Sequence, residues 1–442
     1  MNALYDPRLF PLWEGIESED FVIATYYVAG GPQADLVAKS AALAIEQSSG
    51  SWFAVPGETE EVRARSAARI IGIYSVPNYE LIAQVPRDEP RTFVLRVAFP
   101  WINFYDNLPL LLSSVIGNIS SMPNLKLLDL EFPPSYLAQF KGPKFGIKGV
   151  RELLGVPERP IVNNMIKPCT GIGPEDGAKL FYEAAAGGAD WIKDDELIAG
   201  SPAFSPLTDR VRAYMDAARR ADAEKGEKTL FTANVTDEVG RLRDNAYRAI
   251  EAGANALLVN VFTVGYSGLR MLAEDPNINV PIGAHTCFGG AQTVAPNQGI
   301  STEVAQKLIR LCGADMSLNV APSAKFNALR EKFVRVWHVG YSPMGHIKQT
   351  FTHAGGGVTP GMVPYLMDQI GNDFILGVGA GVHGHPSGPR AGATAMRQAV
   401  DAVMQGVELP EYAKDHPELA TAIATWGIYG VDDYNKLYDI ES

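Results

Sequence analysis

Apolar and polar positions alternate with a regular long period from Pro160 onward. Eight short runs rich in β-branched residues are each followed by a longer amphipathic stretch, such as PEDGAKLFYEAAAGG or RDNAYRAIEAGA. Runs of this kind predict buried strands, and the stretches between them predict helices. The runs are IVNNMIKP (161–168), WIKDDE (191–196), TLFTANV (229–235), ALLVNVF (256–262), PIGAHT (281–286), MSLNV (316–320), QTFTHAG (349–355) and FILGVGAG (374–381).

These runs begin about every 30 residues, which is the length of one strand with its helix. Eight such units in succession favour a (β/α)8 barrel of the TIM type within the α/β class. A doubly wound parallel sheet stays open as an alternative, because the spatial order of strands cannot be seen in a sequence.

The pattern before residue 146 is different and predicts a smaller α+β domain of ferredoxin-like type. Apolar runs at FVIATYYVA (21–29), RTFVLRVAFP (91–100) and KLLDLEFP (126–133) are interspersed with expected helices around 34–47 and before Asn118. The GPKFG segment (142–146) has the glycine and proline content of a linker. We therefore expect an N-terminal domain over 1–145 and a barrel domain with a C-terminal helical tail over 146–442.

Composition and charge limit the kinds of molecule that this protein is expected to bind. The 442 residues are 46% hydrophobic and carry a formal net charge of −12, which fits a globular protein and disfavours binding to nucleic acid or to an anionic membrane. The three cysteines have no C-x-x-C spacing, so neither a disulfide framework nor a zinc ribbon is indicated. The first 20 residues lack a basic region followed by an apolar core, and we expect a cytoplasmic protein.

Chemistry in a barrel gathers at the carboxyl ends of its strands. Polar residues at the expected ends are Lys167, Lys193-Asp194-Asp195-Glu196, His285, His353, and His383 with His385. Strand alternation puts Lys193 and Asp195 on one face, with Glu196 at the rim. Two carboxylates suit Mg²⁺, and a neutral Lys193 that reacted with CO₂ to form a carbamate would add a third oxygen ligand. A structural ion network is the alternative for this tetrapeptide.

Two glycine clusters, 355–357 and 377–381, follow the seventh and eighth runs. Backbone N–H groups at such glycines commonly hold a phosphate in barrels of this type, although ordinary turns also use glycine. His383 and His385 lack a nearby third ligand and are expected to form a polar loop. Cys169, Cys287 and Cys312 have no evident base partner and are expected to be small buried side chains.

These residues carry a resemblance over nearly the whole chain. The sequence resembles the large subunit of ribulose-bisphosphate carboxylase and, more closely, the carboxylase-like proteins. The segments that carry the resemblance are IEQSSGSW (45–52), VIGN (115–118), FGIKGVRELLG (145–155), IKP (166–168), WIKDDE (191–196), GAHT (283–286), AKF (324–326), AGGGVTPGMVP (354–364) and GAGVHGHPSG (379–388).

The resemblance implies an antiparallel homodimer whose active sites each combine one barrel with the partner's N-terminal domain. Lys193 would be the carbamylated lysine that binds Mg²⁺ with Asp195 and Glu196. Lys167 would be the acid/base lysine, His285 would contact a substrate hydroxyl, and Lys325 would be the mobile lysine after strand six. The partner would contribute Glu46, Ser51, Trp52 and Asn118, and the phosphate would lie at Gly355, Gly356, Gly357, Gly379 and Ala380, where alanine is a departure from glycine.

Other departures disfavour carbon fixation. Cys169 stands where carboxylases place a second lysine, and Gly355 stands where they place a serine before the glycine pair. Thr286 and Leu318 stand where they place the arginine and histidine that bind a second phosphate. Losing two cations removes charge-assisted hydrogen bonds of about 1.5–3 kcal/mol each. We therefore expect a substrate with one phosphate, bound at the glycine-rich end.

Four functions remain open within this resemblance. Asn118 and Lys325 favour the group that decarboxylates 3-oxo-isoapionate 4-phosphate, because the 2,3-diketo-5-methylthiopentyl 1-phosphate enolase of methionine salvage has a lysine base in place of Asn118 and no lysine equivalent to Lys325. That enolase is the first alternative, and a phosphosugar isomerase with the same enediolate chemistry is the second. A catalytically inert relative is the non-enzyme alternative.

Overall fold

The computed structural model describes residues 7–50, 55–322, 325 and 328–430. They form two compact units. The first is the described part of Met1–Phe140 together with Phe288–Leu308, and the second is Lys141–Cys287 with the described part of Ile309–Ser442. In the described part of the chain, no helix is both long and apolar enough to cross a membrane.

The first unit is built on a five-stranded sheet in the order β10-β4-β1-β3-β2. β1, β3, β2 and β4 pair in antiparallel fashion, and β10, which comes from the 288–308 segment, adds a parallel edge to β4. The strands are β1 (Phe21–Gly30), β2 (Arg69–Val76), β3 (Arg91–Pro100), β4 (Leu125–Glu131) and β10 (Gly299–Ile300). The expected α+β organisation is present in this unit.

Helices in the first unit begin at side-chain caps where the sequence offers them. Asp35 accepts a hydrogen bond from Ala38 N at the start of α1, and Asn107 accepts one from Leu110 N at the start of α3. The helices are α1 (Leu36–Glu46), α2 (Glu60–Ser66), α3 (Leu108–Ile116), α4 (Pro134–Leu137), α11 (Gly290–Thr293) and α12 (Thr302–Leu311), the last of which continues into the second unit. Short 3-10 turns occur at Pro7–Leu9, Trp13–Gly15, Ser18–Asp20, Ile82–Gln84, Trp101–Asn103 and Asn118–Ser121.

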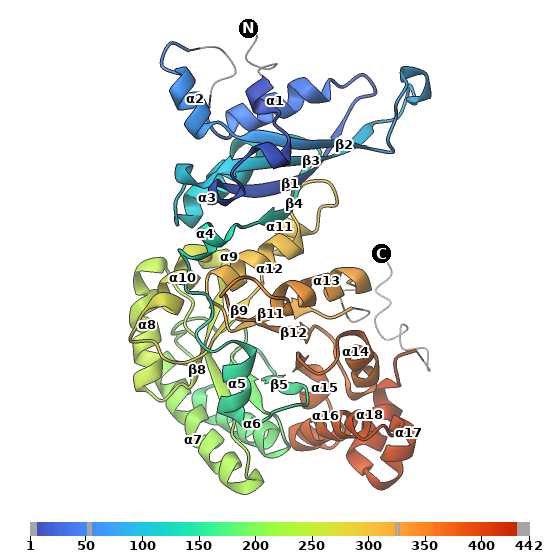
Figure 1. Cartoon of the computed structure of the whole chain (residues 1–442). Coiled ribbons are helices and arrows are strands. Elements are labelled where there is room, and N and C mark those ends of the chain that lie inside the picture. The colour runs from blue at the N-terminus through green and yellow to red at the C-terminus, as the bar shows by residue number, and fades with distance from the viewer. Residues whose placement is uncertain (1–6, 51–54, 323–324, 326–327, 431–442) are drawn as a thin grey trace. The chain divides into compact units, whose positions relative to one another are not determined.

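The second unit is a closed barrel of eight parallel strands (Figure 1). Closure between β13 and β5 confirms the predicted barrel and excludes the open doubly wound sheet. The strands are β5 (Ile161–Met165), β6 (Trp191–Lys193), β7 (Leu230–Asn234), β8 (Ala256–Asn260), β9 (Ile282–His285), β11 (Met316–Val320), β12 (Phe351–Gly355) and β13 (Ile375–Val378). Each predicted run contains one of these strands.

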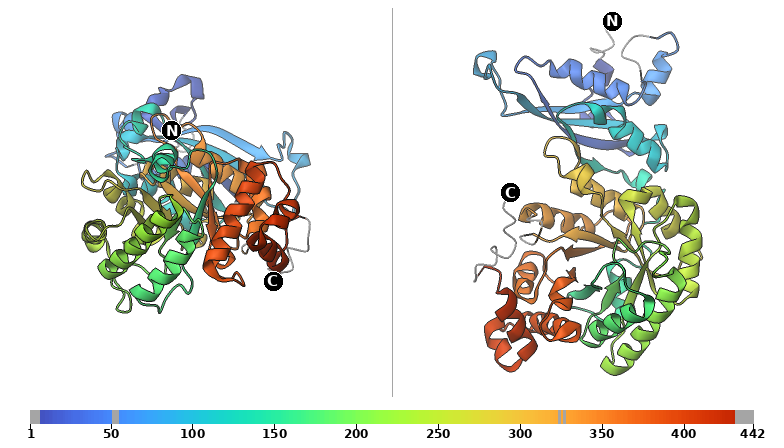
Figure 2. Two further views of the ribbon diagram at one scale, coloured as in Figure 1. Left: turned by 90° about the horizontal axis from the view of Figure 1, so that it is seen from below. Right: turned by 180° about the vertical axis from the view of Figure 1, so that it is seen from behind.

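The long helices that follow the strands lie on the outside of the barrel (Figure 2). The helices after β5 in this unit are α6 (Pro174–Ala186), α7 (Leu207–Lys225), α8 (Val239–Glu251), α9 (Val261–Val264), α10 (Tyr266–Glu274), α13 (Arg330–Tyr341), α14 (Val363–Ile370), α15 (Ala380–His383), α16 (Gly388–Met404), α17 (Leu409–Tyr412) and α18 (Pro417–Trp426), with 3-10 turns at Pro360–Met362 and Ala413–Asp415. Helix α5 (Gly146–Leu154) precedes the first strand and packs with Ile147, Val150 and Leu154 into the barrel core beside Trp191 and Phe351. Apolar packing therefore fills the barrel below the carboxyl ends of the strands.

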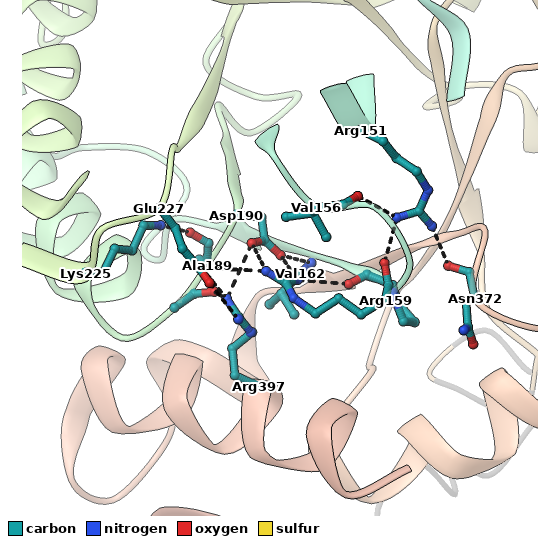
Figure 3. A network of polar contacts seen from close by, with 12 residues as sticks. Arg151, Val156, Arg159, Val162, Ala189, Asp190, Lys225, Glu227, Asn372 and Arg397 are labelled. Carbon is teal, nitrogen blue, oxygen red and sulfur yellow. Dashed lines mark hydrogen bonds and ion pairs between the residues drawn. The ribbon is translucent and has the colours of Figure 1, made fainter. Parts of the chain in front are cut away.

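A polar network ties the start of the barrel to its end (Figure 3). Asp190, directly before β6, is fully buried and accepts hydrogen bonds from both terminal nitrogens of Arg159 at 2.6 Å and from Val162 N at 2.8 Å. Arg397 of α16 lies 3.5 Å from Asp190 and pairs with Glu227 at 2.8 Å. The network thus joins β5 and β6 to the C-terminal helices.

We expect Asp190→Asn to lower the free energy of unfolding by about 3 kcal/mol, because it removes a fully buried charge that two partly buried arginines share. Asp176→Asn is the matched control: Asp176 pairs with Lys179 on the surface, where the side chains are 69% and 77% exposed. That control is expected to change stability by less than about 0.5 kcal/mol. Urea denaturation of both variants measures the difference, and equal midpoints would show that the network contributes no stability.

Candidate active site

One cavity of about 350 Å³ lies at the carboxyl ends of the barrel strands. It brings together all the site residues predicted in the barrel unit. They are Lys167, Lys193, Asp195, Glu196, His285, Lys325, Gly355, Gly356, Gly357, Gly379 and Ala380. Because these residues come from six separate regions of sequence, their convergence is produced by the closed parallel barrel.

The predicted residues of the first unit are described separately. Asn118 Nδ2 lies 3.4 Å from Glu46 Oε1, so these two side chains are neighbours. Ser51 and Trp52 lie outside the described residues.

Lys193 is buried at the end of β6, with 1% of its surface exposed. Its Nζ donates to Asp194 O at 3.0 Å and to Glu196 Oε2 at 3.4 Å. His285 Nε2 lies 3.2 Å from the same Glu196 oxygen. Burial opposes ionisation of Glu196, but the hydrogen bond from His285 and the charge of Lys193 hold the pKa of its carboxyl well below the usual range. Glu196 is therefore an anionic oxygen donor inside the cavity.

The hydrogen bonds of His285 fix its tautomer. Cys287 N donates to His285 Nδ1 at 3.0 Å, so Nδ1 is the acceptor and Nε2 carries the proton that faces Glu196. Burial lowers the pKa of His285, with the positive charge of Lys193 acting in the same direction against the carboxylates. The ring is thus a neutral donor at this end of the cavity.

Lys167 follows β5 and pairs with the second carboxylate. Its Nζ lies 2.8 Å from Asp195 Oδ2 and 2.7 Å from Cys169 Sγ. Burial works against the charged amine, but the hydrogen bonds to Asp195 and Cys169 outweigh it and raise the pKa of Lys167. Burial also raises the pKa of the Cys169 thiol. The pair therefore consists of an ammonium group and a carboxylate, with a neutral thiol beside them.

The expectation of three buried thiols is correct for Cys312 and wrong for the other two. Cys169 and Cys287 are only partly buried, because both follow strand ends at the open end of the barrel. Within the segment Lys193–Glu196, the expected alternative of a structural ion network is correct for Asp194. This residue is buried and pairs with Arg210 Nε at 3.0 Å. Asp195 and Glu196 instead face the cavity.

The residues at this end fit a hard divalent cation that retains waters. Asp195 and Glu196 supply carboxylate oxygens to one cavity, and the buried amine of Lys193 lies 3.4 Å from Glu196 Oε2. The described residues contain no group of three or more His, Cys, Asp or Glu side chains that could hold a metal. A carbamate on Lys193 would add a third protein oxygen to these two carboxylates. His383 and His385 form no such group either, since their Nε2 atoms lie near Asn164 Oδ1 and Glu418 O.

The glycine-rich part of the cavity differs from the part lined by Thr286 and Leu318. Gly356 and Gly357 have φ values of +89° and +104°, which side chains rarely adopt, and a Cβ at Gly357 would lie 2.9 Å from Lys325 N. Lys325 N donates to Gly356 O at 2.9 Å, which brings the segment after β11 to this end. In the part that follows β9 and β11, Thr286 Oγ1 donates to Leu318 O at 2.6 Å. No arginine is among the described residues that line the cavity.

Sequence reasoning gave no role to several residues that line the cavity, including Asn319, Thr359 and Trp426. Trp426 ends α18, far along the chain from the strands, and no motif pointed to it. The sequence marks His353 as a polar residue near a strand end, but its position in the cavity depends on its neighbours. It is 2% exposed, meets Trp191 edge-on with ring centroids 6.4 Å apart, and has a pKa lowered by burial to about 3.

Gly377 makes room for the ring of His353. A Cβ at Gly377 would lie 1.9 Å from Cε1 and 2.0 Å from Nε2 of His353. We expect Gly377→Ala to destabilise the barrel by about 1–3 kcal/mol, and His353→Ala in the same chain to recover part of the loss. Thermal unfolding of the two single variants and the double variant measures this coupling. Strictly additive losses would contradict the contact.

Comparison with known proteins agrees with this geometry. Residues 15–136 match the N-terminal domain of the ribulose bisphosphate carboxylase large chain, and residues 146–426 match its catalytic domain. The chain belongs to the RuBisCO large-chain family. A RuBisCO-like protein of Archaeoglobus fulgidus is 48% identical over 93% of this chain and 94% of its own length. A 2,3-diketo-5-methylthiopentyl-1-phosphate enolase of Bacillus cytotoxicus is 33% identical over 92% and 97%.

A solved RuBisCO of the same family confirms the fold. The octameric enzyme of Pyrococcus horikoshii superimposes with a TM-score of 0.86 at 31% identity, covering 95% of this chain and 96% of its own. Both the expected RuBisCO-like identity and the barrel with its N-terminal α+β domain are therefore correct.

Proposed function

We propose that this RuBisCO family member is a Mg²⁺-dependent enzyme that forms an enediolate from a keto compound with one phosphate and does not fix CO₂. The observation that carries the proposal is the composition of one cavity. Lys167, Asp195, Lys193, Glu196 and His285 line one cavity together with the glycines at 355–357 and 379. The side formed by Thr286 and Leu318 offers a hydroxyl and an apolar chain, which suits no second phosphate.

Each side chain has a distinct role in this proposal. Asp195, Glu196 and a carbamate on Lys193 would hold Mg²⁺, which acts as a Lewis acid toward developing oxyanion charge. Lys167 carries the proton that is returned to or taken from the reacting carbon. His285 donates from Nε2 to a substrate hydroxyl, and the backbone N–H groups of the glycine-rich end bind the phosphate.

Decarboxylation of 3-oxo-isoapionate 4-phosphate is the reaction we favour. This substrate is a β-keto acid with one phosphate, and breaking its bond to the carboxylate carbon leaves an enediolate that Lys167 protonates. Lys325 lines the same cavity and supplies a positive charge for the departing carboxylate. Asn118 supports the assignment because its amide cannot act as a base at neutral pH.

The diketo enolase reaction is the second candidate. Its support is the similarity to relatives named as 2,3-diketo-5-methylthiopentyl-1-phosphate enolases, which extends over nearly their whole length. The same cavity would then remove and return a proton without breaking a carbon–carbon bond, and a phosphosugar isomerase would use it similarly.

One experiment separates these reactions. Enzyme preincubated with Mg²⁺ and bicarbonate is mixed with 3-oxo-isoapionate 4-phosphate while CO₂ release is recorded. Proton exchange on the diketo methylthio phosphate in D₂O is measured alongside. Release without exchange supports the decarboxylase, whereas exchange without release assigns the chain to the enolases. Absence of both activities would contradict the proposal that the protein is an enzyme and would favour an inert relative.

We also propose a homodimer with shared active sites, to which the partner contributes Glu46 and Asn118. The neighbouring positions of these two side chains and the octameric assembly of the P. horikoshii relative support this assembly. Sedimentation velocity tests it, and a protein that stays monomeric at micromolar concentration would exclude the shared site.

A further inference from the structure

The ring of His353 lies on the floor of the cavity and has no role in the function proposed above. His353 is the middle residue of β12, is 2% exposed, and lines the same cavity as Lys193. Its Nδ1 and Nε2 atoms are both buried, and neither makes a hydrogen bond of good geometry among the described residues, although the backbone of Asn319 acts on the ring as a hydrogen-bonding group and raises its pKa against the effect of burial. Buried polar atoms in proteins are nearly always paired, so this ring requires an explanation.

The surroundings of His353 hold the ring in place. A Cβ at Gly377 would lie 1.9 Å from its Cε1, and a Cβ at Gly355 would lie 2.5 Å from the same atom. Only the absence of side chains at these two glycines gives the ring its space. Trp191 contacts it edge-on from β6, with ring centroids 6.4 Å apart. The two nitrogens therefore cannot turn toward solvent without displacing this packing.

Lys193 lies on β6, the strand whose Trp191 contacts the ring. It follows Trp191 by two residues, so both side chains point to the same face of β6. The positive charge of Lys193 is, after burial, the largest cause that lowers the pKa of His353. A neutral imidazole offers one N–H donor and one acceptor. On the side of the barrel that carries Lys193 there is thus a fixed imidazole whose nitrogens make no hydrogen bond of good geometry among the described residues.

We propose that His353 is a positioning residue that donates a hydrogen bond to a carbamate on Lys193. This inference rests on the proposed function. In the modification, the unprotonated amine attacks the carbon of dissolved CO₂. The N–C bond forms, an electron pair of one C=O bond moves to oxygen, and one N–H proton leaves to solvent. The product carries one negative charge on two oxygens.

The two carbamate oxygens need different partners. One would join Asp195 and Glu196 as a metal ligand, and the other would lie in a buried region where an unpaired anionic oxygen is costly. His353 supplies the donor for that second oxygen. A competing explanation is an ordered water that His353 shares with Asn163, whose side-chain nitrogen and oxygen are also buried without a partner among the described residues. Asn163 pairs in register with Gly377, so it lies on the same part of the floor.

The test measures the carbamate directly. Protein with Mg²⁺ is equilibrated with increasing ¹³C-bicarbonate, and the carbamate carbon is followed by ¹³C NMR, with Lys193→Ala identifying the signal. We expect His353→Leu to weaken the apparent affinity of Lys193 for CO₂ roughly 10- to 100-fold, as expected for the loss of a hydrogen bond to a charged group. His353→Gln keeps a donor and is expected to recover most of the affinity. Thermal unfolding of both variants checks that the fold is retained.

Several results would overturn the proposal. Wild-type carbamate affinity in His353→Leu would exclude the hydrogen bond. If His353→Leu and Asn163→Leu lose equal stability and the carbamate affinity of Lys193 is unchanged, the partner of the His353 ring is a water that it shares with Asn163. A wild-type protein without any carbamate would leave His353 nothing to position. Carbamate that depends on His353 in a protein without turnover would instead support this inference and refute the proposed reaction.

Discussion

Replacing Lys193 by alanine is expected to lower Mg²⁺-dependent turnover at least about 1000-fold, which corresponds to about 4 kcal/mol of transition-state stabilisation. The buried amine is the group from which a third oxygen ligand can form beside Asp195 and Glu196. Without it, two carboxylates remain, one of which is paired with Lys167. Steady-state kinetics with saturating Mg²⁺ and bicarbonate measures the loss.

Lys179→Ala is the control for that prediction. Lys179 is 77% exposed and pairs only weakly with Asp176 on the surface, so its removal is expected to leave turnover within twofold of the unchanged protein. Full Mg²⁺-dependent turnover in Lys193→Ala would refute the mechanism for decarboxylation and enolisation alike, because both depend on the same metal site.

Replacing Lys167 by methionine is expected to lower kcat about 100- to 10,000-fold while Mg²⁺ binding is retained or strengthened. The lost rate is that of a general acid–base group. The retained binding follows from the 2.8 Å ion pair between Lys167 Nζ and Asp195 Oδ2, since the ammonium group competes with a cation for that oxygen. Calorimetric titration of Mg²⁺ beside single-turnover kinetics separates the two effects.

The contrast between the two lysines is the informative part of this prediction. Lys193→Ala should lose metal binding and turnover together, whereas Lys167→Met should lose turnover alone. Parallel loss of both properties in Lys167→Met would mean that this lysine maintains the shape of the site and does not transfer the proton.

The barrel was predictable because its pattern is local and repeated. Each buried strand is a short apolar run, and the runs recur at the length of one strand–helix unit. Predicted strands such as 161–168 and 191–196 are longer than observed, since β5 ends at Met165 and β6 at Lys193. The chain leaves the sheet there to present Lys167, Asp195 and Glu196 to the cavity. The residues by which the predicted strands exceed the observed ones are therefore the residues that form the active site.

Convergence of the site could be predicted for a similar reason. Parallel strands in a closed barrel end at one face, so residues that follow different strands must meet. The sequence could not predict three details of the site: the pairing of Lys167 with Asp195, the tautomer of His285 and the position of Trp426. Each depends on a single contact between distant segments, which leaves no periodic or spaced signal. The addition of β10 to the N-terminal sheet is of the same kind, because two residues make that pairing.

Titration of Mg²⁺ into the protein with and without bicarbonate, followed by calorimetry, tests the central claim most directly. The proposed site has two carboxylates and needs a carbamate on Lys193 as its third protein ligand. We therefore expect Mg²⁺ to bind at least about tenfold more tightly when bicarbonate is present, and expect Lys193→Ala to abolish that difference. Mg²⁺ affinity that is the same with and without bicarbonate would contradict the account.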